Sequence, residues 1–290
     1  MNHEQIIQKV TSKVLNIPEK NIKIISRLMG GMSNYTYIIQ ANDDKYTFRI
    51  PGKNAENFVD RDIEVYHIDL IEPLNLNNQT IYLDTESGYK IAKYIEGQPL
   101  HELSPYDYLD KAAEVLRTVH QSNLISQYDY QPFTRLTKYE DLVKAYNHRH
   151  DDRYHEYKST LLSHKDFLDQ QEKTLCHGDS QISNFVVSKD ELYLMDWEFT
   201  GMNDPFYDIA CFGNANFEHA IAILPVYLER TPNSDDYNRL YLWRTFQCLQ
   251  WHNVALYKEF IGLSKDLSID FKKVAGLYLD KAQALLAKLK

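Results

Sequence analysis

Residues 177–184 of this chain read His-Gly-Asp-Ser-Gln-Ile-Ser-Asn, and residues 196–198 read Asp-Trp-Glu. Asn184 follows Asp179 by five positions, and Asp196 follows Asn184 by twelve. The residues between the motifs form two apolar runs around a polar turn, at 185–187, 192–195 and 188–190. The pattern predicts a loop followed by a hairpin. Such a hairpin returns Asp196 to the side of the loop, so we expect the three polar side chains to converge.

These residue types suit phosphoryl transfer from a nucleotide. That reaction needs one carboxylate to accept or orient the acceptor hydroxyl, and oxygen ligands to hold Mg²⁺ against the phosphates. We expect Asp179, Asn184 and Asp196 to be catalytic, with Asn184 and Asp196 also binding the metal. Asp, Asn, Gly and Ser often occur in turns for local reasons. Four such residue types at fixed offsets on a loop and hairpin favour a functional site.

The motif resembles the catalytic and metal-binding loops of the aminoglycoside phosphotransferase and choline kinase superfamily, which is related to the protein kinases. The resemblance extends over nearly the whole chain and is most specific from His177 to Glu198. It implies a bilobal, protein-kinase-like α+β fold with ATP and Mg²⁺ as cofactors. It also places the adenine nucleotide near residues 95–97, which makes Glu96 a candidate contact. Asp208 lies in a segment that resembles the family helix behind the catalytic loop, and we expect it to orient that loop.

Hydrophobic periodicity divides the chain near residue 97. Residues 1–96 are predicted to form an opening helix and then a five-stranded antiparallel sheet, interrupted by one helix at about 58–71. Residues 97–290 are predicted to be mostly helical, with long helical stretches at 106–121, 139–146, 154–170 and from 207 onward. We therefore expect an N-terminal nucleotide-binding lobe and a larger C-terminal catalytic and substrate-binding lobe.

The predicted N-terminal lobe supplies candidate nucleotide contacts. Residues 30–34 read Gly-Gly-Met-Ser-Asn between two strands and are similar to the family's nucleotide loop, so we expect Ser33 and Asn34 near the phosphates. On the third strand, Lys45 and Arg49 share one face. Choline kinases and close relatives carry Arg within a stretch similar to residues 48–52, so the resemblance selects Arg49 over Lys45. Glu64, on the next helix, is its expected partner.

The composition of the 290-residue chain excludes some classes of function. Lys and Arg total 32 against 41 Asp and Glu, and the resulting net charge of −9 repels the phosphates of nucleic acids and anionic lipids. We therefore expect neither nucleic acid nor membrane as a partner. The 22 Tyr, 12 Phe and 3 Trp supply ring faces, which together with carboxylates attract a small cationic substrate.

The three cysteines, Cys176, Cys211 and Cys248, have no paired spacing, so the sequence predicts neither a disulfide framework nor a zinc site. The N-terminus lacks the basic start and apolar core of a signal peptide. The longest apolar run, at 220–228, is interrupted by Pro225 and is too short to span a bilayer. We therefore expect a cytoplasmic protein, and the sequence makes no prediction of its oligomeric state.

Aromatic and polar residues of the predicted C-terminal lobe are candidates for acceptor binding. Choline kinases carry a Trp- and Tyr-rich late helix that walls the choline pocket, and residues 241–257 look like that segment. A quaternary ammonium cannot donate an ordinary N–H hydrogen bond, so ring faces and negative charge must recognise it. The candidate substrate contacts are Gln181, Trp197, Glu198, Tyr207, Trp243, Trp251 and Tyr257, and Glu198 is also a candidate metal ligand.

The resulting hypothesis is a bacterial-type choline kinase that forms phosphocholine and ADP. Kinases for ethanolamine, thiamine or an aminoglycoside are the alternatives, because superfamily membership fixes the phosphoryl donor better than the acceptor. A nucleotide-binding pseudokinase is a further alternative. The joint presence of Asp179, Asn184 and Asp196 argues against it.

Overall fold

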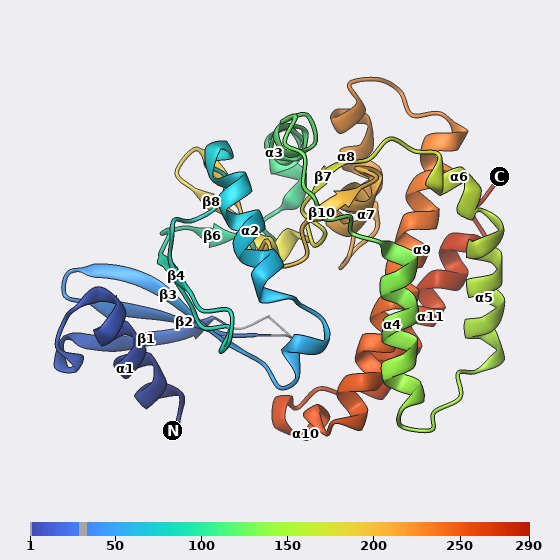
Figure 1. The fold of residues 1–290 in the computed structure, drawn as a ribbon. Helices are drawn as coiled ribbons and strands as arrows, with labels where there is room; N and C mark the ends of the chain where they lie inside the picture. The colour runs from blue at the N-terminus through green and yellow to red at the C-terminus, as the bar shows by residue number, and fades with distance from the viewer. Residues whose placement is uncertain (1, 29–33) are drawn as a thin grey trace. The chain divides into compact units, whose positions relative to one another are not determined.

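The computed structural model describes residues 2–28 and 34–290 (Figure 1). The chain divides into two units. The first unit contains Met1–Pro105 and Ile182–Thr200, and the second contains Tyr106–Gln181 and Gly201–Lys290. No helix within the two described ranges is both long and apolar enough to cross a bilayer.

The first unit is built on a five-stranded antiparallel sheet with the strand order β1-β2-β3-β5-β4. Its elements are α1 (His3–Leu15), β1 (Ile22–Leu28), β2 (Asn34–Ala41), β3 (Asp44–Pro51), α2 (Arg61–Ile71), β4 (Thr80–Leu83), β5 (Lys90–Lys93), β6 (Gln98–Pro99), β8 (Phe185–Ser188) and β9 (Glu191–Leu194). The predicted α+β organisation with an N-terminal antiparallel sheet is confirmed.

Alternation along β3 assigns the two faces of this sheet. Tyr46, Phe48 and Ile50 point into an apolar core that Ile7 of α1 completes. Arg49 projects from the opposite face and meets Glu64 of α2. The helix α2 begins at the Asp60 cap, whose carboxylate accepts two backbone N–H groups. One face of the sheet is therefore apolar and packed, and the other carries charge.

A second, three-stranded sheet explains why Ile182–Thr200 belongs to the first unit. β6 pairs with β8, and β8 pairs with β9. The Leu194 N–H also donates to the Leu76 carbonyl at 2.8 Å. The sequence prediction placed a single boundary near residue 97, whereas the first unit runs to Pro105 and includes this later hairpin.

The second unit is mostly helical, as predicted. Its elements are α3 (Leu109–His120), α4 (Pro132–Lys144), α5 (Asp152–Ser163), α6 (Lys165–Asp169), β7 (Thr174–Cys176), β10 (Gly201–Asn203), α7 (Phe206–Phe212), α8 (Glu218–Leu228), α9 (Ser234–Phe260), α10 (Leu263–Leu267) and α11 (Phe271–Leu286). The 27-residue helix α9 is its centre, with α11, α7 and α4 packed against it (Figure 1). β7 pairs with β10 on either side of the catalytic loop in the sequence.

Candidate active site

A buried ion pair lies on the charged face of the first unit's sheet. The Arg49 guanidinium donates to Glu64 in a bidentate arrangement, at 2.6 Å from Nη1 to Oε1 and 2.9 Å from Nη2 to Oε2. Both side chains are almost fully buried. Burial alone would raise the pKa of Glu64, but the charge and hydrogen bonds of Arg49 lower it to about 2. The pairing predicted from the sequence is present, and Glu64 is ionised.

Two further cations, which we did not predict, surround Glu64. Arg61 Nη1 donates to Glu64 Oε2 at 2.6 Å, and Lys90 Nζ lies 3.9 Å from Oε1. For both residues, the sequence contains a pattern that could have predicted the contact with Glu64. Arg61 precedes Glu64 by three positions on α2, which places the two side chains on one helix face. Lys90 lies directly opposite Arg49 in the ladder between β3 and β5.

Glu198 closes the cluster from the acidic motif. Its carboxylate accepts from Arg61 Nη1 at 2.8 Å and lies 3.4 Å from Arg49 Nη1. The Asn34 amide donates to both of its oxygens at 3.1 Å. The side chain is only 2% exposed. The Glu198 carboxylate therefore already accepts hydrogen bonds from cationic and amide groups. This arrangement favours a role for Glu198 in positioning the arginines, rather than the predicted contacts with Mg²⁺ or substrate.

The hairpin brings Asn184 and Asp196 together within the first unit. Asn184 ends a short 3₁₀ turn, and its carbonyl accepts the Met195 N–H at 2.7 Å. Asp196 has a positive φ of 69°, in the left-handed region that Asp and Asn adopt more readily than most other non-glycine residues. Its side chain is 38% exposed and lies 4.0 Å from Arg49 Nη1. Partial burial and the nearby Glu198 carboxylate raise its pKa to about 7, which a bound cation would reverse.

The Asp208 side chain holds the catalytic loop of the second unit by accepting hydrogen bonds from the loop's backbone N–H groups. The carboxylate of Asp208 accepts the N–H groups of His177 at 2.7 Å and Gly178 at 2.9 Å, as we predicted. His120 of α3 adds a contact from Nε2 at 3.1 Å, and this residue was not predicted. Gly178 has a φ of +81°, which suits glycine. The loop that presents Asp179 is therefore fixed from behind.

Asp179 itself is buried, and the side chains of Gln181 and Cys211 in the same unit contact its carboxylate. The Gln181 amide donates to Asp179 Oδ2 at 3.1 Å, and the Cys211 thiol lies 3.6 Å from Oδ1. Gln181 also accepts from Asn214 at 2.8 Å. Both ends of the Gln181 amide are engaged inside the protein, so Gln181 orients Asp179.

Comparison with known proteins identifies the family. The model of the choline/ethanolamine kinase family matches residues 25–245. The chain belongs to this family. This confirms the resemblance from which we predicted an enzyme of the choline kinase superfamily.

Individual relatives of this choline/ethanolamine kinase family member agree with the match. The chain is 25% identical to Protein LicA of Haemophilus influenzae over 211 residues, which are 70% of this chain and 62% of that relative. The crystal structure of choline kinase LicA from Streptococcus pneumoniae has a TM-score of 0.79 at 25% identity, over 98% of each chain. A crystal structure of LicA in complex with AMP has a TM-score of 0.80 at 25% identity, over 100% of each chain.

The cation cluster consists of Arg49, Arg61 and Lys90 with the two glutamates that bind them. In this family member the cluster retains hydrogen-bond donors that could bind phosphate oxygens. Arg49 Nε and Arg61 Nη2 are buried and have no hydrogen-bond partner among the described residues. Buried guanidinium donors left without acceptors are costly, and phosphate groups satisfy them well. The cluster therefore fits a nucleotide's phosphates. Asp196 lies beside it, and Asn184 is joined to the adjacent Met195 by a backbone hydrogen bond; both side chains carry oxygens of the type that Mg²⁺ prefers.

The other predicted nucleotide contacts are placed differently. Ser33 lies outside the described residues. Asn34 donates to Glu198. Glu96 is exposed on the surface and pairs with Lys45 at 2.5 Å. Asn34 therefore lies in the cation cluster, whereas Glu96 lies on the exposed surface of the first unit.

The predicted aromatic contacts differ in exposure. Trp197 is fully buried, and its indole N–H donates to the Leu194 carbonyl at 2.7 Å. Trp243 is 2% exposed, donates to Asp204 at 2.6 Å and packs edge-on against Tyr207. Tyr207 and Tyr257 are also buried. Trp251 alone of the three tryptophans is half-buried, and it is therefore the best placed to offer a ring face to a ligand.

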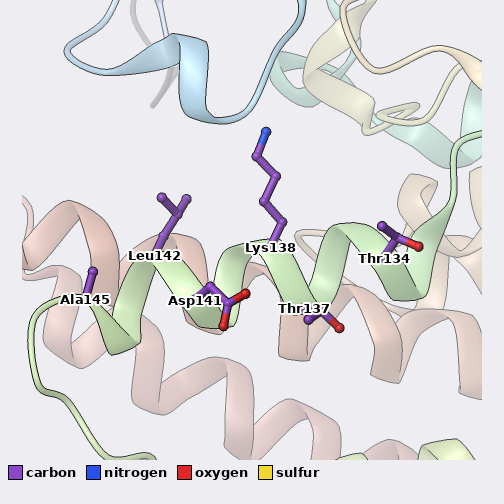
Figure 2. Close-up of a pocket in the computed structure, with 6 residues that line it drawn as sticks. All are labelled: Thr134, Thr137, Lys138, Asp141, Leu142 and Ala145. Atoms are coloured by element: carbon purple, nitrogen blue, oxygen red, sulfur yellow. The ribbon is translucent and has the colours of Figure 1, made fainter.

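A surface hollow of about 630 Å³ runs along α4 (Figure 2). It is lined by Thr134, Thr137, Lys138, Asp141, Leu142 and Ala145. Five of the six belong to α4 and Ala145 is its C-cap, and none is a predicted site residue. The hollow therefore adds nothing to the candidate active site.

Glu64→Gln tests the electrostatics of the buried cluster. The substitution leaves Arg49, Arg61 and Lys90 without their shared anion, so we expect the free energy of unfolding at pH 7 to fall by about 3–5 kcal/mol. The pKa of Glu64 is about 2 in the folded protein and near 4.3 in an unfolded chain. Its contribution is therefore complete above about pH 4.5 and is lost as the pH falls toward 2. Urea denaturation at several pH values measures this.

The control for this prediction is Glu72→Gln, which changes an exposed carboxylate at the C-cap position of the same helix. It should change the free energy of unfolding by less than about 0.5 kcal/mol. Equal stability of the Glu64→Gln variant and the parent protein at pH 7 would show that the cluster is not held together by this charge.

Proposed function

We propose that this family member catalyses ATP- and Mg²⁺-dependent phosphoryl transfer to the hydroxyl of choline, giving phosphocholine and ADP. The family match over residues 25–245 carries the proposal, because that range includes the cation cluster and the whole acidic motif. The similarity to choline kinase LicA from Streptococcus pneumoniae supports choline as the acceptor. The similarity to LicA bound to AMP supports an adenine nucleotide as the donor.

The first unit is proposed to bind the nucleotide and metal. Arg49 and Arg61 donate from Nε and Nη2 to phosphate oxygens, and Glu64 holds both guanidinium groups in place. Asp196 and Asn184 supply oxygen ligands for Mg²⁺. When bound, Mg²⁺ neutralises charge on the transferred phosphoryl group. Positioning and charge neutralisation supply most of the rate in such reactions.

The second unit is proposed to handle the acceptor. Asp179 receives or orients the proton of the choline hydroxyl, and Gln181 keeps its carboxylate oriented. Asp208 keeps the backbone of the loop in place. We propose that Trp251 contributes a ring face to the trimethylammonium group. Trp243 and Tyr207 pack against each other in the interior of the same unit, so we assign them a structural role.

Ethanolamine is the second candidate acceptor, because the matching family includes both choline and ethanolamine kinases. A primary ammonium donates three N–H hydrogen bonds and gains most from carboxylates, whereas a quaternary ammonium depends on ring faces. The balance of aromatic and acidic contacts around the ammonium group decides between the two.

Paired tryptophan variants separate binding from folding. We expect Trp251→Ala to raise the KM for choline by about tenfold and to leave the KM for ATP unchanged, because a ring face is worth about 1–2 kcal/mol to a cation. Trp243→Ala should instead lower the free energy of unfolding by about 3–5 kcal/mol, because it removes a buried ring and one of the hydrogen-bond donors to Asp204. Steady-state kinetics and thermal denaturation of both variants provide the comparison. An unchanged KM for choline in Trp251→Ala would remove Trp251 from the proposed site.

Product formation tests the proposed reaction. Phosphorus NMR of purified protein with ATP, Mg²⁺ and choline should show the resonances of phosphocholine and ADP growing together. Chelation of Mg²⁺ with EDTA should stop both. Hydrolysis of ATP without phosphocholine would contradict the proposal.

A further inference from the structure

Arg244 of α9 is a buried cation that forms no ion pair with a carboxylate among the described residues. Its side chain is 2% exposed. Its donors go to amides instead, at 2.9 Å to Gln247 Oε1, 2.7 Å to Asn214 Oδ1 and 3.2 Å to the Asn214 carbonyl. Burying an arginine without a counter-charge is unfavourable. Its presence here requires either a compensating anion at longer range or a function.

A continuous chain of hydrogen bonds connects this cation to Asp179. Arg244 donates to Asn214, the Asn214 amide donates to Gln181 at 2.8 Å, and the Gln181 amide donates to Asp179 at 3.1 Å. A guanidinium can only donate, and an ionised carboxylate can only accept. The two amides therefore have only one orientation that satisfies every partner, and their dipoles align along the chain. Such aligned hydrogen bonds polarise one another.

Cys211 lies close enough to both ends of this hydrogen-bond chain to be affected by the charges of Asp179 and Arg244. Its thiol lies 3.6 Å from Asp179 Oδ1. Burial raises the pKa of Cys211, the charge of Asp179 raises it further, and the charge of Arg244 lowers it. One side chain is thus within electrostatic range of both the cation and the carboxylate.

We propose that Arg244 is a positioning residue for Asp179, acting through the side-chain amides of Asn214 and Gln181. It fixes the orientation of the Gln181 amide, and its positive charge favours the ionised form of the Asp179 carboxylate. This inference rests on the proposed function, in which Asp179 receives the acceptor hydroxyl. All four residues belong to the second unit.

The pKa of Asp179 is the direct readout. It can be measured by carbon NMR on protein labelled at aspartate Cγ, with the Asp179→Asn variant assigning the resonance. A unit charge roughly 10 Å away, at an effective dielectric constant of about 20, shifts a carboxyl pKa by about one pH unit. Arg244→Gln should therefore raise the pKa of Asp179 by about one unit. Arg244→Lys keeps the charge and should shift it much less, while Cys211 and Asp208 stay in every variant.

The control is Arg153→Gln, which removes an exposed arginine that pairs with Asp280 and should leave the pKa of Asp179 unchanged. Asn214→Ala interrupts the hydrogen-bond chain at a half-buried residue, and Arg244 keeps its acceptors on Gln247 and the residue 214 carbonyl. It therefore replaces Arg244→Gln if that variant fails to fold. It should lower kcat by about tenfold with little change in the KM for ATP, because Asp179 loses its oriented donor.

Two results would overturn the inference. If Arg244→Gln and Arg244→Lys shift the pKa of Asp179 equally, or neither shifts it, Arg244 acts only through packing. If Asn214→Ala changes neither the pKa of Asp179 nor kcat, the amides of Asn214 and Gln181 do not couple Arg244 to Asp179. The NMR measurement needs no turnover, so it separates failure of this inference from failure of the proposed kinase activity.

Discussion

Replacing Asp179 with Asn should lower kcat for choline phosphorylation by about 10³-fold, because a positioned general base contributes about 10²–10⁴. Asn keeps the size of the side chain and can still accept from Gln181, so the loop held by Asp208 should remain folded. Affinity for ATP should be retained, because the cation cluster belongs to the first unit, while Asp179 belongs to the second. Single-turnover kinetics and calorimetric titration with ATP measure the two properties separately.

Asp190→Asn is the matched control, since Asp190 is an exposed residue of the turn between β8 and β9. It should leave turnover unchanged. A variant Asp179→Asn with near-normal kcat would remove Asp179 from its proposed role. Loss of ATP affinity together with turnover would point to a damaged fold.

Asp196→Asn should abolish the Mg²⁺ dependence of nucleotide binding and lower kcat/KM by at least about 100-fold, because the metal loses an anionic oxygen ligand. Asn is the appropriate replacement, since Asp196 has a φ of 69° and Asn tolerates that conformation. Calorimetric titration with ATP, with and without Mg²⁺, measures the effect. In the parent protein Mg²⁺ should strengthen binding, and in the variant it should not.

Glu191→Gln, at an exposed position of β9, is the control for loss of one carboxylate from the same hairpin. Equal Mg²⁺ dependence in Asp196→Asn and in the parent protein would show that another residue holds the metal.

The sequence was most informative where local pattern and structure coincide. Alternation in residues 45–50 identified the strand that the structure shows as β3 and assigned Arg49 to the face opposite Phe48, and this placement is confirmed. The spacing of the acidic motif predicted the hairpin that brings Asn184 and Asp196 together. These features depend on residues that are close in the sequence or on side chains that alternate with a period of two. Both kinds of pattern can be recognised in a single sequence.

Features that depend on distant residues were missed. The hairpin of β8 and β9 belongs to the first unit because β6 pairs with β8, across more than eighty residues of sequence. Lys90 joins the cation cluster through the register of β3 and β5. Arg244 is connected to Asp179 through the side-chain amides of Asn214 and Gln181, which come from separate segments. No local pattern specifies such pairings.

Which of the aromatic residues are buried could also not be predicted from the sequence. Trp243 and Trp251 lie on one helix, but Trp243 is tied to Asp204, which Arg239 also pairs with at 2.5 Å. That tertiary contact makes Trp243 part of the core. Periodicity alone cannot distinguish a core tryptophan from one that faces a ligand.

Acceptor selectivity tests the central claim most directly. The kcat/KM values for choline, ethanolamine and an aminoglycoside should be measured in parallel with the purified protein, saturating ATP and Mg²⁺, by following ADP release. The proposed function predicts the highest kcat/KM for choline, with turnover abolished by EDTA. Turnover with none of the three acceptors would contradict a choline kinase, and a higher kcat/KM for ethanolamine would contradict recognition of choline by ring faces.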